Sequence, residues 1–181
     1  MTNFVSHFFQ RTENKALRGL KISLKDLKDF YKLLSKKNRD AAEYEINNWN
    51  RSSLNDSEWE NLKTEIRDAY RVRVLINKIG GGSVSGDSES VFEPENFPAE
   101  VSSVSLETGF VFHALAQKFA RNNAVIKLDF GRVSPWNFSI IPGFETYNDS
   151  QMSVSGAESA WVSSLATDAI SFLDNKKRDF I

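Results

Sequence analysis

The sequence predicts an α+β protein: an N-terminal antiparallel helical hairpin in residues 1–70, followed by a small mixed β-sheet domain of four or five strands with two helices in residues 71–181. Two observations lead to this prediction. Up to residue 70, apolar residues recur every three or four positions, which is typical of helices with one buried face. After residue 70, several segments alternate apolar and polar residues, which is typical of strands.

The longest helical pattern runs from Ser23 to Trp49. Its apolar stripe consists of Leu24, Leu27, Tyr31, Leu34, Ala41, Ala42, Ile46 and Trp49. Ser23 can cap the first turn, because its hydroxyl accepts from a backbone N–H that has no intrahelical partner, and Asp26 places a carboxylate near the positive end. At 1.5 Å per residue this helix is roughly 40 Å long, so we expect a second helix to cover part of its stripe.

A polar break leads from this helix into a second one. Asn55 or Asp56 can cap the second helix. Its inner face would be formed by Trp59, Leu62, Ile66, Ala69 and Tyr70. Two helices joined by about six polar residues are expected to form an antiparallel hairpin with Trp49 and Trp59 near its turn.

Strand patterns begin at residue 71, where Val72, Val74 and Ile76 alternate with Arg71, Arg73 and Leu75. Further strands are expected in residues 83–92, 101–107 and 124–130 and around residues 152–154. Helices are expected in residues 112–119 and after Gly156, the latter with Trp161, Leu165, Ala169 and Phe172 facing inward. The order strand, helix, strand in residues 101–130 predicts a right-handed parallel crossover.

The composition excludes several classes of protein. The chain contains no cysteine, so disulfides, thiolate catalysis and cysteine-based zinc sites are excluded. An apolar share of 40%, with fourteen Phe and four Trp, is that of a folded chain. No stretch reaches the ~18–20 apolar residues of a membrane-spanning helix. We therefore expect a cytoplasmic protein.

Charge is distributed unevenly along the chain, although the net charge is only −1. Residues 1–78 hold 16 basic and 11 acidic side chains, whereas residues 79–181 hold 7 and 13. The simplest explanation is complementarity within the molecule or between subunits, in which the basic half faces the acidic half. This explanation competes with an external anionic partner.

Lysines recur along one side of the long helix, at Lys21, Lys25, Lys28, Lys32 and Lys36. Their spacing of three and four residues places them together at the edge of the solvent face. Such a lysine stripe is either a solvated face with extended side-chain stems or a docking site for an anionic partner. If it is a docking site, the partner is another protein or a nucleic acid.

Candidate catalytic residues are few. The two histidines, His7 and His113, occur in unrelated places. Glu107 and Asp129 each end a predicted strand, and in a parallel pair their carboxylates would be neighbours. A metal-dependent nuclease would need a third carboxylate, or a lysine two residues after an acid, but here Lys127 precedes Asp129. We therefore expect no catalytic residues, no metal and no cofactor.

The segment 131–150 is rich in aromatic residues and contains a possible ligand site. Arg132, Trp136 and Tyr147 could form a cationic, aromatic pocket beside the C-terminal edge of the sheet, where ligands of α/β proteins bind. Long aromatic loops also serve to cover an exposed sheet face, so both interpretations stay open.

These observations favour a non-catalytic protein–protein interaction or assembly module, in which the helical region engages another protein or a second copy of the chain. The first alternative is a nucleic-acid-binding protein that uses the lysine stripe, and the second is a metal-assisted hydrolase around Glu107 and Asp129. The hairpin, the small sheet and the closing helix together look like a bacterial or phage accessory protein, an analogy that assigns no role to any residue.

Overall fold

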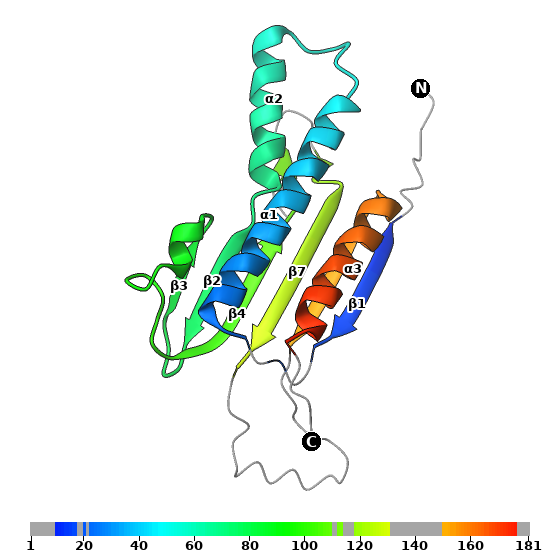
Figure 1. Ribbon diagram of the computed structural model, residues 1–181. Coiled ribbons are helices and arrows are strands. Elements are labelled where there is room, and N and C mark those ends of the chain that lie inside the picture. Colours follow the sequence, from blue (N-terminus) through cyan, green and yellow to red (C-terminus); the bar gives the residue numbers. More distant parts are fainter. Residues whose placement is uncertain are drawn as a thin grey trace, which may run out of the picture.

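The structure is a computed structural model that describes residues 10–17, 20, 22–109, 112–113, 118–130 and 150–176. In chain order its elements are β1 (Arg11–Ala16), α1 (Leu24–Asn47), α2 (Asp56–Ala69), β2 (Arg73–Lys78), β3 (Ser83–Gly86), the 3-10 helix η1 (Glu89–Phe92), β4 (Val101–Thr108), β5 (Phe112–His113), β6 (Lys118–Phe119), β7 (Asn122–Asp129), β8 (Gln151–Gly156) and α3 (Ser159–Asp174). The predicted α+β class is confirmed (Figure 1). None of the described helices is long and apolar enough to cross a membrane.

Six strands form one sheet in the order β1-β8-β7-β4-β2-β3, and every neighbouring pair is antiparallel. The sheet is therefore antiparallel rather than mixed, and the parallel crossover expected in residues 101–130 is absent, because β4 and β7 are direct antiparallel neighbours. Its edge strand β1 comes from residues for which no strand was predicted. Because the residues of β1 are polar and almost all exposed, its sequence lacks the alternation of apolar and polar residues by which strands were predicted.

A helix was expected in residues 112–119, but the structure has the short antiparallel pair β5 and β6 there. The backbone register places Phe112 opposite Phe119. A separation of seven residues fits two turns of a helix and also two opposing positions of a hairpin. The apolar spacing of this segment was therefore compatible with either structure.

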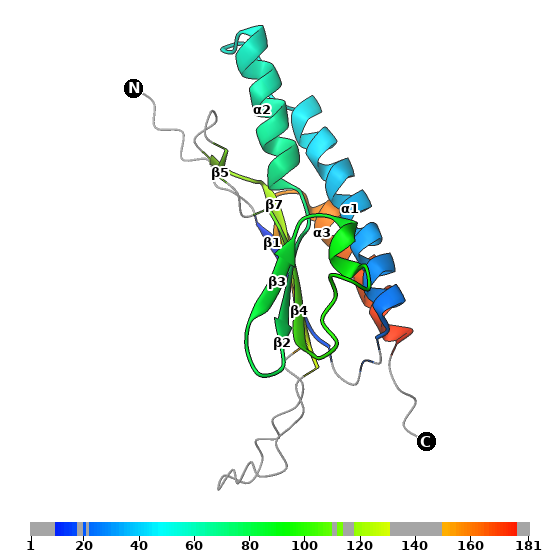
Figure 2. The same cartoon turned by 90° about the vertical axis from the view of Figure 1, so that its left-hand side faces the viewer.

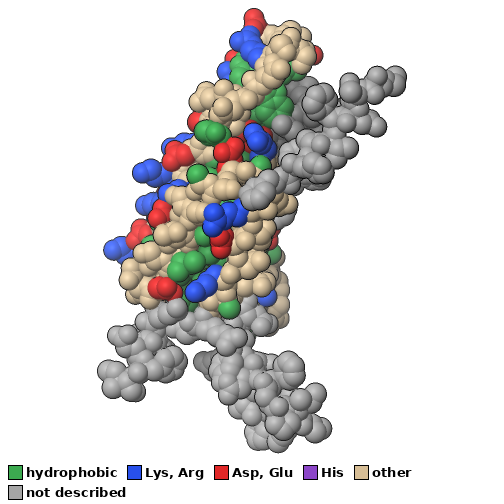
Figure 3. Space-filling model, turned by 90° about the vertical axis from the view of Figure 1, so that its right-hand side faces the viewer, with side chains coloured by type: hydrophobic (Ala, Val, Ile, Leu, Met, Phe, Trp, Pro, Cys, Tyr) green, Lys and Arg blue, Asp and Glu red, His purple; other side chains and the backbone are tan. Residues whose placement is uncertain are grey.

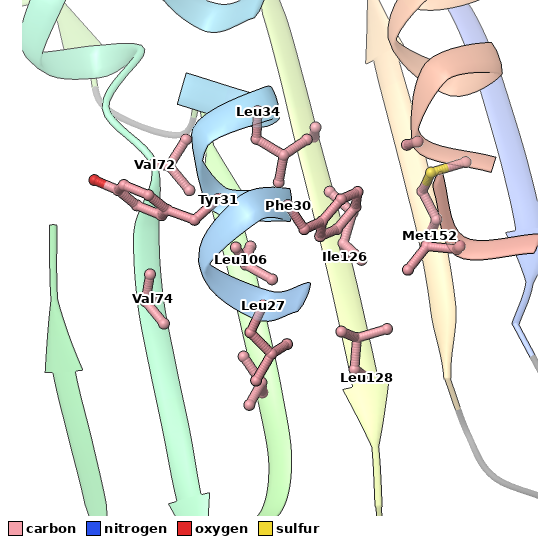
Figure 4. Packing of buried hydrophobic residues seen from close by; sticks show 14 of the residues in the cluster. Leu27, Phe30, Tyr31, Leu34, Val72, Val74, Leu106, Ile126, Leu128 and Met152 are labelled. Atoms are coloured by element: carbon pink, nitrogen blue, oxygen red, sulfur yellow. The ribbon is translucent and has the colours of Figure 1, made fainter. Parts of the chain in front are cut away.

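Helices α1 and α3 cover one face of the sheet (Figure 2). On α1 the buried side chains of this layer are Leu27, Phe30, Tyr31 and Leu34, and they point toward the strands (Figure 4). The strand residues that meet them include Val74, Leu106, Ile126, Leu128 and Met152. Phe30 also stacks on Phe172 of α3, with ring centroids 5.1 Å apart. This layer forms the main hydrophobic core.

The second half of α1 continues past the sheet and packs against α2, and the two helices project together as a hairpin (Figures 1 and 2). Both predicted helix starts are confirmed. Ser23 with Asp26, and Asn55 with Glu58, each form a capping box, in which the cap side chain accepts a backbone N–H and the acid accepts the N–H of the cap residue. These caps determine where the two helices begin.

Candidate functional site

A cleft of about 510 Å³ opens where three segments meet: the middle of α1, the junction of α2 with β2, and the turn between β3 and η1. Its size is in the range of small-ligand sites, roughly 300–1,000 Å³. Its charged lining residues are Arg39, Glu43, Arg67, Arg71 and Asp87. The cleft is thus built from segments that are far apart in the sequence, and we call it the arginine cleft.

One wall of the arginine cleft is held by Asp87. The Tyr31 hydroxyl of α1 donates to the Asp87 carbonyl oxygen at 2.9 Å. Arg71 Nη1 donates to the Asp87 carboxylate at 3.0 Å, and Arg71 Nη2 lies 2.9 Å from Asp68. The hydrogen bond to Asp87 raises the pKa of Arg71. Because these contacts join α1, the start of β2 and the β3–η1 turn, this wall is formed without a ligand.

The opposite wall joins the two helices of the hairpin. Arg67 of α2 donates to both carboxylate oxygens of Glu43 on α1, with Nε–Oε1 at 2.7 Å and Nη2–Oε2 at 3.2 Å. This bidentate contact lowers the pKa of Glu43 and raises that of Arg67. Both side chains remain about half exposed, so the pair contributes only ~0.2–1 kcal/mol to stability.

Arg39 differs from the other two arginines. It lies on α1 one turn before Glu43, it is exposed, and it forms no ion pair with any residue that the structure describes. Three guanidinium groups and two carboxylates line the cleft, and a third carboxylate, that of Asp68, pairs with Arg71 beside it. Arg39 is the guanidinium group that pairs with none of these acids.

The predicted lysine stripe is divided by the acidic side chains of η1 and the residue after it. Lys28 Nζ lies 3.1 Å from Glu89 and 2.8 Å from Glu93, and Lys32 Nζ lies 3.1 Å from Glu89. Lys25 and Lys36 are exposed and form no ion pair within the described part of the chain. The remaining member of the stripe, Lys21, lies outside the described residues.

Ion pairs between the two halves of the chain recur elsewhere. Lys37 of α1 contacts Asp168 of α3 at 2.5 Å, and Arg71 contacts Asp87. On the face shown in Figure 3, basic and acidic side chains alternate along the helices, and no broad area carries one sign. Much of the charge split seen in the sequence is therefore compensated within the molecule.

The two carboxylates of the predicted hydrolase site are not neighbours. In the antiparallel register of β4 with β7, Glu107 lies opposite Val125 whereas Asp129 lies opposite Ser103. The two acids are four positions apart along the strands, roughly 13 Å at about 3.3 Å per residue. Among the described residues no three His, Asp or Glu side chains are grouped to hold a metal ion. The expected proximity is wrong because it depended on parallel strands.

The other predicted ligand site lies outside the described residues, since it consists of Arg132, Trp136 and Tyr147. His7 and the side chain of His113 also lie outside them.

Sequence reasoning missed the arginine cleft, although one signal was present. Arg39 continues the spacing of Lys32 and Lys36 along one side of α1, and Arg67 and Arg71 are four residues apart where α2 gives way to β2. Nothing in the sequence indicated that these arginines line one cleft with Asp87. Comparison of the chain with protein-family models, curated proteins and solved structures found no match. The functional argument therefore depends on the residues alone.

Proposed function

We propose that this protein is a non-catalytic protein–protein interaction or assembly module whose helical hairpin engages another protein or a second copy of the chain. The observation that carries the proposal is the projection of the hairpin beyond the sheet, with Trp49, Leu54 and Trp59 only partly buried at its tip (Figure 1). These side chains lie away from the main core. A projecting element with aromatic side chains at its end is well suited to contact a partner.

The chemistry of the tip supports this proposal. Tryptophan and arginine are enriched among the residues that dominate binding energy at protein interfaces. Arg51 and Lys63 lie over the Trp59 ring at 5.9 and 5.7 Å from its centroid, and Arg51 is also paired with Asp56. The tip thus combines apolar surface with cations that are already oriented, which reduces the entropy lost on binding.

Nucleic-acid binding by the lysine stripe is the alternative of a different class. It is less favoured, because phosphate groups would have to displace Glu89 and Glu93 from Lys28 and Lys32. A metal-assisted hydrolase around Glu107 and Asp129 is the least favoured, because the two carboxylates lie four strand positions apart.

The test is a pull-down with the tagged full chain from a lysate divided into nuclease-treated and untreated halves. We expect the same protein in both halves, and we expect Trp59→Ala to reduce its recovery at least tenfold, because this change removes one of the two tryptophans of the tip together with the ring on which Arg51 and Lys63 lie. The matched control is Ile79→Ala, which truncates a side chain that is 51% exposed in the β2–β3 turn and should retain the partner. Circular dichroism verifies that both variants are folded.

Three results would contradict the proposal or its site. Equal recovery by Trp59→Ala and the unmodified chain would exclude the tip. Material that is lost after nuclease treatment would favour the nucleic-acid alternative. If only the bait is recovered, sedimentation of the purified chain decides whether a second copy is the partner, and a monomer at all concentrations would contradict the proposed function.

A further inference from the structure

We propose that the arginine cleft binds a carboxylate side chain from an acidic segment of the partner protein, with Arg39 as the anchor. This inference deepens the proposed function and depends on it for the natural partner. It adds a second contact surface, at the base of the hairpin, to the aromatic tip.

The cleft has more hydrogen-bond donors than the protein itself uses. A guanidinium group carries five N–H donors, and Arg67 directs only two of them to Glu43. Arg39 makes no ion pair with any described residue and lies next to these groups. Donors from two helices therefore line one cleft, in which Glu43 pairs with Arg67 and Asp87 pairs with Arg71, and Arg39 pairs with neither.

Guanidinium groups match carboxylates and phosphates in shape, because two parallel N–H groups can bind two oxygens. The distribution of acids around the cleft favours carboxylates on a peptide. Glu43 and Asp87 lie among the arginines, and Glu89 and Glu93 lie beside the neighbouring lysines. Duplex DNA carries one negative charge per ~1.7 Å and would be repelled by these acids. A peptide with spaced carboxylates can contact the cations and avoid the acids.

The cations next to the cleft indicate an extended ligand rather than a small molecule. Lys36 and Lys32 lie one and two turns before Arg39 on the same side of α1, and Lys36 is exposed without an ion pair to any described residue. This basic side of α1 extends about 21 Å from Lys25 to Arg39, at 1.5 Å per residue. An acidic segment with one carboxylate at Arg39 can thus place a second at Lys36.

The pairing inside the cleft also predicts how its affinity can be raised. Glu43 holds Arg67 through a half-exposed pair that is weak, so an incoming carboxylate competes with Glu43 for the same guanidinium group. Removing the charge of Glu43 frees Arg67 and removes a repulsive group. Glu43→Gln should therefore bind an acidic ligand more tightly than the unmodified chain.

The probe is a fluorescein-labelled, acetylated eight-residue peptide in which glutamate alternates with serine, measured by fluorescence anisotropy against the purified full chain at low salt. We expect Arg39→Gln to weaken binding at least tenfold and Glu43→Gln to strengthen it about threefold. The matched control is Arg73→Gln, which removes an exposed arginine of β2 outside the cleft and should leave the affinity unchanged. The same peptide with glutamine in place of glutamate should not bind.

Unchanged affinity in Arg39→Gln, or weaker binding by Glu43→Gln, would overturn the inference. An RNA oligonucleotide of equal charge that binds more tightly than the peptide, and that loses affinity in Lys25→Gln but not in Arg39→Gln, would overturn it in favour of nucleic acid. The peptide assay needs no natural partner. If the peptide does not bind but the pull-down captures a protein, the cleft is rejected and the proposed function is retained. Peptide binding by the cleft, without any protein capture and with a chain that stays monomeric, supports the carboxylate site and rejects the proposed function.

Discussion

The two halves of α1 are buried in different ways. From Leu27 to Leu34 the helix lies on the sheet, and large apolar side chains fill the space between them (Figure 4). From residue 38 to residue 46 the helix faces α2 and the end of the sheet, and its buried residues are Asn38, Ala41, Ala42, Glu45 and Ile46. The first half is therefore stabilised by apolar area, whereas the second half has small side chains and two buried polar groups.

The second half gains its contacts to the rest of the protein through a buried chain of hydrogen bonds. The Tyr70 hydroxyl donates to Glu45 at 2.8 Å and accepts the backbone N–H of Asn122 at 3.2 Å. The Asn122 side-chain oxygen accepts the backbone N–H of Glu158 at 3.2 Å. Burial, followed by the nearby charge of Glu45, raises the pKa of Tyr70 far above its usual value, so the hydroxyl remains a donor. These directional contacts set the position of the hairpin relative to β7 and α3.

One continuous helix thus serves two purposes. Apolar burial is not directional, so the first half anchors the fold, whereas hydrogen bonds fix an orientation. The half that carries the hairpin combines a small apolar cluster with these hydrogen bonds. Changes in the first half should therefore affect the whole protein, and changes in the second half should affect the hairpin most.

The largest effect is expected from Phe30→Ala. This change removes a fully buried ring that stacks on Phe172, and large-to-small substitutions of this kind cost about 3–5 kcal/mol of the free energy of unfolding. Urea unfolding followed by circular dichroism measures it. The control is Tyr44→Ala, which removes an aromatic side chain that is 51% exposed on the same helix and should cost less than about 0.5 kcal/mol. If both variants lose a similar amount of the free energy of unfolding, the first half of α1 is not the part that anchors the fold.

A smaller effect is expected from Tyr70→Phe. When the Tyr70 hydroxyl is removed, the Glu45 carboxylate and the Asn122 N–H lose a buried hydrogen-bond partner. This loss should lower the free energy of unfolding by about 1–3 kcal/mol. The matched change Tyr31→Phe removes a hydroxyl that donates to Asp87 at the edge of the arginine cleft and should cost about 0.5–1.5 kcal/mol. Amide hydrogen exchange should show that Tyr70→Phe loosens α2 before the sheet. If the amides of α2 and those of the sheet lose protection equally in Tyr70→Phe, the hairpin is not a separate unit.

The smallest effect concerns the start of α1 and depends on pH. Hydrogen bonds from Lys176 and then Ser23 lower the pKa of Asp26 from 3.8 to about 2. Because the folded-state pKa is the lower one, the stabilisation is fully present above about pH 4 and is lost as pH falls toward 2. We expect Asp26→Asn to cost about 1 kcal/mol at pH 7, as for a lost cap, and nearly nothing at pH 2. The exposed Asp29→Asn is the control, and a pH-independent difference between Asp26→Asn and the unmodified chain would refute the prediction.

Local rules correctly located most of the elements. The capping residues Ser23 and Asn55 marked both helix starts, and the alternation of Val72, Val74 and Ile76 gave the buried face of β2, because each signal depends only on neighbours in the chain. The same reasoning failed for β1, whose residues are almost all exposed, and for residues 112–119, whose spacing fits two structures. Strand direction also failed, because it depends on which strands become neighbours.

The sequence by itself determined that this protein is an α+β protein with a capped helical pair and a basic helix face, since periodicity, caps and charge are local properties. Only the tertiary structure decided which charges meet. It separated Glu107 from Asp129, neutralised Lys28 and Lys32 with Glu89 and Glu93, and brought Arg39 together with residues of α2 and the β3–η1 turn. The physical reason is that electrostatic interactions depend on distances in space, and these are set by how helices and strands pack.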